Sequence, residues 1–533
     1  MSRAVPAILS MSVVVAGALV PAQAADDASA RWWAHVSFLA NDDLQGRDTG
    51  SEGHKKAAAY IAEQFKAAGL APAGTSGYLQ PVQFTSRQIV EAQSSLALVR
   101  DGKVEPVALG PDAAFSVRID PAPQVEAPLA FVGYGLSIPE LKIDDLAGQD
   151  LRDKVAVYLL GSPAGVPDAL SAHAQSAAVR WAALKKAGAL GAIVLQHPGR
   201  IEPPWERSTL ARLQPAMSLA DPVLDDTAGQ QVSIAFNPAS AERLFAGSGH
   251  TFAEMVALAD TRKPLPGFPL PTAVRAKVAV DKTTITSDNV AGTLVGSDAA
   301  LRDEYVVLSA HLDHLGVGGA AGGDRIYNGA MDNASGIASL IETAATLARA
   351  PEKPKRSILF VAVTAEEKGL LGSRYFATHP PVPPRAVVAN LNMDMFLPLF
   401  PMKSVMVFGL DESDLGTSVR AVAASMGLGV QGDPEPLRNR FIRSDQYSFV
   451  RQGVPALALK VGYVPDSPDA NTHAAWTKER YHAPSDDLQQ PVDRGSAVVF
   501  NDLLVRLTIA VANQPLRPRW NDQSFFKRFA AAP

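Results

Sequence analysis

The chain has 533 residues, of which 47% are hydrophobic and 19% are charged, and its formal net charge at pH 7 is −5. This composition predicts a packed globular protein of two or three domains rather than a disordered chain. Because the sequence has no sustained basic block, nucleic-acid binding has no electrostatic support. The absence of cysteine excludes disulfides, thiolate metal ligands and a cysteine nucleophile.

The N-terminus has the pattern of a secretory signal peptide. An apolar stretch at 4–20 follows Arg3, and small residues then stand at positions 22 and 24. This arrangement fits signal-peptide cleavage, so we expect a signal peptide at 1–24 and a mature chain that begins at Ala25. The alternative is a retained membrane anchor, for which the apolar run is short. We therefore expect a periplasmic or secreted protein with no membrane contact after cleavage.

In the first half of the chain the predicted elements are mixed. Apolar residues at helical spacing predict a helix over 53–70, which Gly69 ends. Short alternating strands are expected between residues 84 and 120. Residues 178–198 have the pattern of a helix, a glycine turn and a strand, and the proline-rich stretch 262–271 resembles a linker.

Beyond residue 271, apolar strands alternate with helices. The predicted strands are 289–296, 305–311, 356–364, 386–394 and 454–461, and helices are expected at 333–350 and 415–427. Strands that alternate with helices predict an α/β fold with a largely parallel sheet that is covered on both faces. Ligands of such sheets bind at the C-terminal ends of the strands.

Polar residues gather at or near those strand ends. They are His311, Asp313, His314, Asp332, Glu366, Glu367, Asp394 and His482. One such residue alone is usually a cap or a solvated side chain, and we assign no site role to His35, His54, His173, His197, His250 and His379. Carboxylates at this density would repel one another unless cations lay among them. Imidazole and carboxylate ligands without thiolate favour zinc or a similar divalent ion.

Other common catalytic motifs are missing. The sequence has no H-E-x-x-H helix, no G-x-S-x-G elbow and no G-x-x-x-x-G-K-[ST] loop. The glycine-rich stretch 316–323 lacks the lysine and the hydroxyl residue of a phosphate loop, and we expect it to form a flexible loop between His311 and Asp332.

Five segments resemble, in order, the motifs of metallopeptidase family 28, the two-zinc aminopeptidases related to glutamate carboxypeptidase. They are AHLDHLG, NGAMDNASG, AEEKGLLGS, LNMDM and YHAPSDDL. The resemblance covers about 272–512, and residues 44–70 are similar to the family's N-terminal helix region. It implies the zinc exopeptidase fold, an α/β fold whose mixed, mostly parallel central sheet has helices on both faces.

Residues from about 121 to 262 resemble the smaller α/β protease-associated domain that many members of this family carry as an insertion. The implied division of the chain is a signal peptide at 1–24, peptidase segments at 25–120 and 263–513, the inserted domain at 121–262, and a tail at 514–533.

The resemblance also implies two zinc ions per chain and their ligands. His311, Asp332 and Asp394 would hold one ion. Asp332, Glu367 and His482 would hold the other, so that Asp332 bridges the two.

Further roles follow from the same resemblance. Glu366 would be the general base and Tyr481 would stabilise the oxyanion. Asp313 and Asp486 would orient the two histidine ligands, because metal-bound imidazoles usually donate to a carboxylate. The peptide bond that follows Asp332 would be cis, as in relatives.

One stretch departs from the family pattern. In residues 441–449, Gln446 stands where a histidine is frequent. Arg438, Arg440 and Arg443 lie beside it, and a carboxypeptidase would need such cations to face a substrate carboxylate. The alternative is that they are surface arginines, which the usual exposure of arginine favours.

The sequence thus predicts an exported zinc exopeptidase that acts on peptides, in the first place an aminopeptidase. A carboxypeptidase or an amidohydrolase of the same fold is the main alternative. A receptor-like, non-catalytic relative is disfavoured because the ligands and the base are all present, and a one-zinc enzyme similar to glutaminyl cyclase is disfavoured by the five ligands. The oligomeric state stays open.

Overall fold

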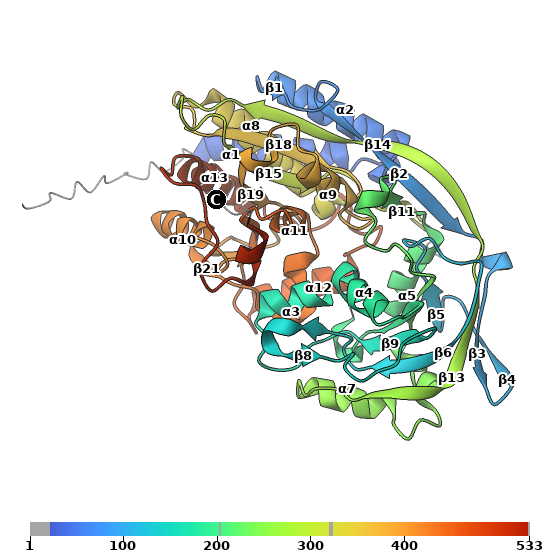
Figure 1. Ribbon diagram of the computed structural model, residues 1–533. Coiled ribbons are helices and arrows are strands. Elements are labelled where there is room, and N and C mark those ends of the chain that lie inside the picture. The colour runs from blue at the N-terminus through green and yellow to red at the C-terminus, as the bar shows by residue number, and fades with distance from the viewer. Residues whose placement is uncertain (1–21, 202–203, 319–322, 531–533) are drawn as a thin grey trace, which may run out of the picture.

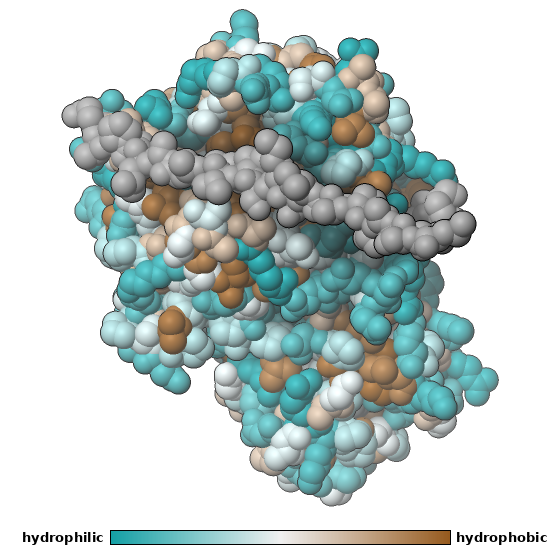
Figure 2. Space-filling view, turned by 90° about the vertical axis from the view of Figure 1, so that its left-hand side faces the viewer, coloured by the Kyte–Doolittle hydropathy of each residue, from teal (hydrophilic) through white to brown (hydrophobic). Residues whose placement is uncertain are grey.

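The computed structural model describes residues 22–201, 204–318 and 323–530. They form a larger and a smaller lobe, which long strands connect along one side (Figure 1). On another face the two lobes are separated by an indentation (Figure 2). Most of the predicted signal peptide lies outside the described residues, which begin with helix α1 (Ala22–Leu39).

The larger lobe is built on a ten-stranded mixed sheet. Its strand order is β11-β2-β14-β18-β15-β19-β22-β20-β21, and β1 pairs with β14. The strands are β1 (Ala71–Pro72), β2 (Leu79–Ile89), β11 (Ala216–Leu219), β14 (Val280–Leu294), β15 (Tyr305–His311), β18 (Ser357–Val363), β19 (Val387–Asn392), β20 (Ser404–Phe408), β21 (Gly429–Gln431) and β22 (Ala456–Val461).

The centre of this sheet is parallel. β18, β15, β19 and β22 run in one direction, so their C-terminal ends lie at one edge. The strand β18 is buried along its whole length, as a strand covered on both faces must be. The predicted mixed α/β sheet is confirmed, with its parallel pairs at the centre and antiparallel pairs among β1, β2, β11, β14 and β18, and the five predicted strands correspond to β14, β15, β18, β19 and β22.

Helices cover the sheet in two groups. α8 (Ser335–Arg349) and α13 (Arg494–Ala512) pack on β15 and against α1, while α9 (Leu371–Thr378) and α11 (Gln446–Val450) pack together against β18, β19 and β22. By length and composition α13 is also apolar enough to cross a membrane, but half of its most apolar window is buried against the rest of the lobe. The remaining helices of this lobe are α2 (Glu52–Ala67), α10 (Leu415–Ser425) and α12 (Pro468–Glu479).

The smaller lobe contains an eight-stranded sheet with the order β4-β3-β13-β6-β9-β10-β12-β5. Its strands are β3 (Ser95–Arg100), β4 (Lys103–Val107), β5 (Ala113–Phe115), β6 (Gln124–Val132), β9 (Val155–Leu159), β10 (Gly191–Leu195), β12 (Val232–Phe236) and β13 (Gly267–Lys277). Its helices are α3 (Asp168–Gln175), α4 (Ala177–Lys186), α5 (Trp205–Ser208), α6 (Glu242–Phe245) and α7 (Phe252–Asp260).

The second sheet extends beyond the predicted insertion at 121–262. It includes β3, β4 and β5 before that range and β13 after it, whereas β11, from inside the range, pairs with β2 in the larger sheet. The predicted linker at 262–271 is wrong from Gly267 onward, because Gly267–Leu270 pairs with β6. Its prolines at 269 and 271 are compatible with a strand whose register shifts between Leu270 and Ala273. The identity of this lobe as a protease-associated domain stays a prediction.

Candidate metal centre

The site lies where the parallel strands end. His311 is the last residue of β15, and Asp313 and His314 follow in the loop. β18 stops at Val363, and Ala365 takes a positive φ of 55°, which no strand residue can keep. The chain therefore turns directly after the strand and brings Glu366 and Glu367 to the same edge.

The carboxylate of Asp313 holds this turn in place. It accepts hydrogen bonds from the backbone N–H of Glu366 (3.0 Å), from that of Glu367 (3.3 Å) and from the Thr49 hydroxyl (3.0 Å). The ring nitrogen Nδ1 of His311 lies 3.1 Å from the backbone oxygen of Asp313 and 4.0 Å from its carboxylate. The predicted contact between the Asp313 carboxylate and His311 is therefore not formed, and His311 contacts the backbone carbonyl of Asp313 instead. The Asp313 carboxylate positions the two glutamates.

Asp486 has a similar function for the bridging residue. Its carboxylate accepts from the backbone N–H of Met331 (2.9 Å) and of Asp332 (3.0 Å), and from the side chain of Gln490. The expected hydrogen bond from His482 to Asp486 is not formed among the described residues, because those donors occupy the carboxylate. The peptide bond Asp332–Asn333 is cis, as predicted.

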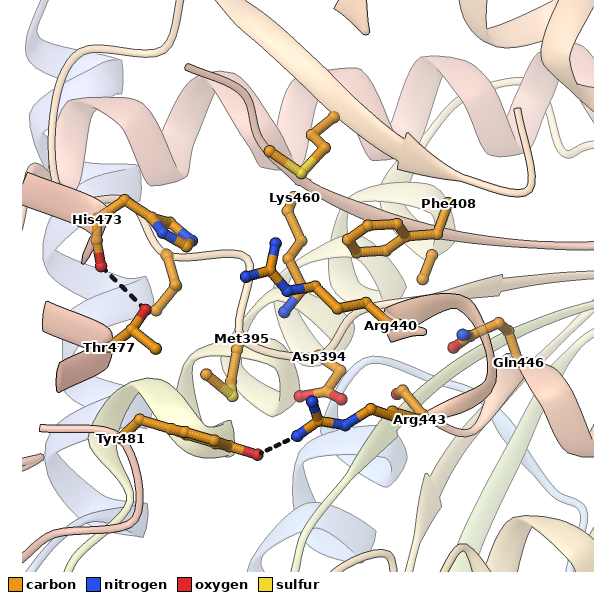
Figure 3. A pocket seen from close by; sticks show the side chains of 14 residues that line it. Asp394, Met395, Phe408, Arg440, Arg443, Gln446, Lys460, His473, Thr477 and Tyr481 are labelled. Carbon is orange, nitrogen blue, oxygen red and sulfur yellow. Dashed lines mark hydrogen bonds between the residues drawn. The ribbon is translucent and has the colours of Figure 1, made fainter. Parts of the chain in front are cut away.

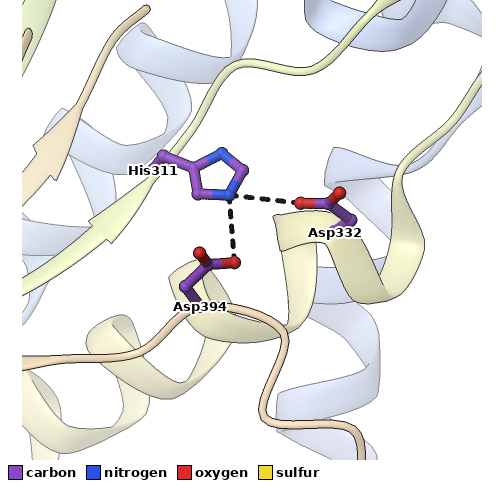
Figure 4. Close-up of side chains that lie close together, drawn as sticks. All are labelled: His311, Asp332 and Asp394. Atoms are coloured by element: carbon purple, nitrogen blue, oxygen red, sulfur yellow. Dashed lines mark hydrogen bonds and ion pairs between the residues drawn. The ribbon is translucent and has the colours of Figure 1, made fainter. Parts of the chain in front are cut away.

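His311, Asp332 and Asp394 form the first group of donors (Figure 4). Nε2 of His311 lies 3.2 Å from Oδ1 of Asp332 and 3.3 Å from Oδ1 of Asp394. One donor atom from each residue falls within 4.8 Å of the others, which is close enough for one ion to reach all three.

A second group shares Asp332. Nε2 of His482 lies 3.4 Å from Oδ2 of Asp332 and 3.2 Å from Oε2 of Glu367. The other oxygen of Glu367 lies 2.7 Å from Nδ1 of His314, a buried residue whose Nε2 has no hydrogen-bond partner among the described residues. The five predicted ligands thus converge, and the structure adds His314 as a further donor beside Glu367. Its place in the strand-end segment HLDH was the signal in the sequence.

The electrostatics of the cluster show an excess of negative charge. Burial alone would lower the pKa of His311, but the surrounding carboxylates, Glu366 first among them, raise it well above the usual value. The pKa of His482 is also raised against the effect of burial, mainly by Glu367. Protonated imidazoles here compensate carboxylates, and metal cations would take over that function.

The donor set fits two zinc ions. Imidazole nitrogens and carboxylate oxygens are ligands that zinc accepts, and a carboxylate with one oxygen toward each group can serve both. Asp332 has this arrangement, since Oδ1 faces His311 and Oδ2 faces His482.

Glu366 stands beside the donors without joining either group. Among the described residues its carboxylate has no hydrogen-bond or ion-pair partner, and its hydrogen bonds are made by its backbone N–H and carbonyl groups. Burial raises the pKa of Glu366 well above the usual value, and the neighbouring charges of Asp394 and Glu367 add to this. A carboxyl group with a raised pKa can both accept and return a proton near neutral pH.

Tyr481 and Gln446 lie on the Asp394 side of the centre. The Tyr481 ring is 4.0 Å from that of His482, and its hydroxyl accepts a hydrogen bond of 3.4 Å from Arg443. Gln446 is fully buried, accepts from the Asn392 amide and donates to the backbone of Phe441. It therefore fixes the strand end that carries Asp394.

The smaller lobe reaches the ligand loops. Arg118 donates to the backbone oxygen of Glu367 (2.8 Å), and Arg207 donates to that of Tyr481 (2.8 Å). These contacts connect the smaller lobe to the loops that carry two of the predicted zinc ligands, Glu367 and His482.

Two cavities flank the centre. A small one of about 80 Å³ is lined by Asp394 and Tyr481. A larger one of about 330 Å³ is lined by Glu367 and His482 on one side and by Arg118 and Arg207 on the other. The centre thus lies between a short pocket and a wider cleft that the smaller lobe helps to wall.

Comparison with known proteins agrees with this site. The model of peptidase family M28 matches residues 289–508, which contain every predicted ligand. The predicted resemblance to peptidase family M28 is confirmed over these residues. The chain is 32% identical over 182 residues to leupeptin-inactivating enzyme 1 of Streptomyces exfoliatus, which covers 34% of this chain and 38% of that protein. It is 29% identical over 184 residues to a probable leucine aminopeptidase 2 of Aspergillus fumigatus, covering 33% and 34% of the two chains.

The match spans little more than a third of either curated M28 relative. The likeness to a solved structure is longer. The aminopeptidase from Aneurinibacillus sp. strain AM-1 superimposes over 90% of this chain and 93% of its own with a TM-score of 0.55 at 20% identity. At this identity the comparison shows that the two share a fold.

Asp486→Asn is expected to weaken zinc binding about 10- to 100-fold, because an amide turns an N–H group toward the backbone donors that now fix Asp332. Asp487→Asn is the matched control, since the side chain of Asp487 caps only the N–H of Gln489. Zinc affinity is measured by competition with a chelator of known strength. Equal affinities of the two variants would contradict the positioning role of Asp486.

Proposed function

We propose that this chain is an exported zinc-dependent exopeptidase, in the first place an aminopeptidase that releases N-terminal residues from peptides. The observation that carries the proposal is the convergence of two imidazoles and three carboxylates, with the unengaged Glu366 beside them. Export is supported by the signal-like sequence at 1–24.

The residues divide the chemistry among them. The zinc ions would be held by five residues, and His314 is a further donor beside Glu367. The five are His311, Asp332, Asp394, Glu367 and His482. Zinc bound there would supply Lewis-acid polarisation of the scissile carbonyl and of the attacking water.

Glu366 and Tyr481 act on the reacting atoms in this proposal. The Glu366 carboxylate takes a proton from the attacking water and gives it to the nitrogen of the leaving amine, so that the base is regenerated. The Tyr481 hydroxyl donates a hydrogen bond to the oxygen of the former carbonyl, where negative charge develops. Burial raises the pKa of Tyr481, which keeps the hydroxyl protonated as a donor.

The shape around the centre favours an exopeptidase. The pocket on the Asp394 side, at about 80 Å³, has room for one short side chain, whereas the cleft on the Glu367 side is about 330 Å³. A substrate with one residue on one side of the scissile bond and a chain on the other fits this asymmetry.

The activity is tested on aminoacyl anilides, with N-acetylated dipeptides as the substrates of the carboxypeptidase alternative. We expect hydrolysis of anilides with a free amino group, loss of that activity after chelation, and recovery on addition of zinc. Hydrolysis of acetylated dipeptides alone would overturn the aminopeptidase in favour of the carboxypeptidase. Activity that survives complete removal of metal would contradict the zinc mechanism.

The two adjacent glutamates are expected to respond differently to the same substitution. Glu366→Gln should retain both zinc ions, while kcat falls about 10²- to 10⁴-fold because the base is lost; this corresponds to about 3–5 kcal/mol of barrier. Glu367→Gln should lose zinc from one site, since a neutral amide is a poor ligand. Metal content and kcat are measured on both variants. Loss of zinc from the first variant but not from the second would show that the roles are reversed.

A further inference from the structure

The small pocket beside Asp394 has an unusual charge. Three cationic side chains line it, and they point toward the same space next to Asp394 (Figure 3). They are Arg440, Arg443 and Lys460. The single carboxylate on its wall, Asp394, belongs to the proposed zinc ligands, so it is not available to neutralise them.

Lys460 is the most informative of the three. It projects from β22, the last of the four parallel strands, which pairs antiparallel with β20 on its other side, and it is partly buried. Among the residues that the structure describes, its ammonium group has no hydrogen-bond or ion-pair partner, and it lies 6.0 Å from the centre of the Phe408 ring. A partly buried ammonium group without a partner is costly unless a ligand supplies the anion.

The arginines stand at different depths. Arg443 is exposed at the rim and donates to the Tyr481 hydroxyl, without a carboxylate partner in the described part of the chain. Arg440 is only 14% exposed and pairs with Glu435 at 2.8 Å and more distantly with Asp433 at 3.8 Å. The interpretation as surface arginines is therefore wrong for Arg440, which lines the pocket while its charge is shared with neighbouring carboxylates.

The other walls do not counter this positive charge. Met406, Phe408 and Ala458 are apolar and suit a short aliphatic stem. His473 stays neutral, because burial, with Arg440 and Lys460 nearby, lowers its pKa to about 3. A volume of about 80 Å³ corresponds to two or three water molecules, which is room for a carboxymethyl or carboxyethyl group.

We propose that this pocket recognises a carboxylate of the substrate, through Lys460 at its floor and Arg443 at its rim. In the aminopeptidase proposed above, on which this inference rests, that carboxylate is the side chain of an N-terminal aspartate or glutamate. The same chemistry could come from the terminal carboxylate of a peptide, which the carboxypeptidase alternative would bind.

The first test compares pairs of anilides that differ only in charge, Glu against Gln and Asp against Asn, with Ala as the neutral reference. We expect kcat/KM to favour the acidic member of each pair about 10- to 100-fold, as a charge-assisted contact in a partly desolvated pocket does. Lys460→Met keeps the length of the side chain and removes its charge, so it should bring both ratios close to one, and the Ala anilide measured on the same variant gives the part of any change that does not depend on substrate charge.

Lys478→Met is the matched control, because Lys478 lies on α12 next to the pocket residue Thr477 but is exposed outside the pocket. It should leave the ratios unchanged. Arg443→Gln serves as a second variant in case Lys460→Met does not fold, and it should lower the same ratios. Acetylated dipeptides with and without a free terminal carboxylate test whether the pocket instead binds the terminal carboxylate of a peptide.

The second test needs no turnover. Binding of free L-glutamate and L-glutamine to the zinc-loaded Glu366→Gln protein is measured by calorimetry, and we expect glutamate to bind at least about tenfold tighter, a difference that Lys460→Met removes. If kcat/KM is the same for neutral and acidic anilides, and glutamine binds as tightly as glutamate, the inference is overturned while the proposed function stands. If no peptide substrate is cleaved but glutamate binds selectively, the proposed function fails and the pocket assignment is retained.

Discussion

Three buried carboxylates meet at the C-terminal edge of the main sheet, and their mutual repulsion is the constraint on which the rest of this structure depends. Donor atoms of Asp332 and Asp394 lie within 4.8 Å of each other. Two negative charges at that distance cost on the order of 3–4 kcal/mol at an effective dielectric constant of 20. This is a large part of the 5–15 kcal/mol by which a domain is usually stable. Positive charge must therefore reach the cluster, from imidazolium in the absence of metal and from zinc when it is bound.

The fold holds these groups together by backbone hydrogen bonds rather than by direct contacts with the histidines. Asp313 fixes the turn of Glu366 and Glu367, and Asp486 fixes the backbone at Asp332. Both carboxylates are buried and engaged with N–H groups, so they hold the backbone of the donor loops in addition to the ion pairs within the cluster. The smaller lobe adds Arg118 and Arg207 to two of the same loops, so the site is completed from both lobes.

Much of this was predictable from sequence because apolar strands are recognisable and parallel strands end at one edge. Five of the ten strands of the larger sheet were predicted in this way, and the five residues that the family resemblance implied as ligands lie together at that edge. Gly267–Lys277 was missed as a strand because its prolines indicated a linker, yet a proline can stand where no ladder hydrogen bond is needed. Asp313 and Asp486 were expected to contact the histidine ligands, whereas both accept hydrogen bonds from backbone N–H groups. Sequence does not show which N–H groups a buried carboxylate will meet. The charge of the small pocket depends on Arg440, in a short helical turn, and Lys460, on β22, which are 20 positions apart and come together only in the folded chain.

The metal content of the purified protein tests the central claim most directly. After dialysis against metal-free buffer and titration with zinc, tightly bound zinc is counted per chain by atomic emission, with the unfolding temperature followed in parallel. The account predicts two zinc ions per chain and a rise in unfolding temperature as they bind, because the cations relieve the repulsion among Asp332, Glu367 and Asp394. A protein that binds no zinc, or whose stability does not change when zinc binds, would contradict it.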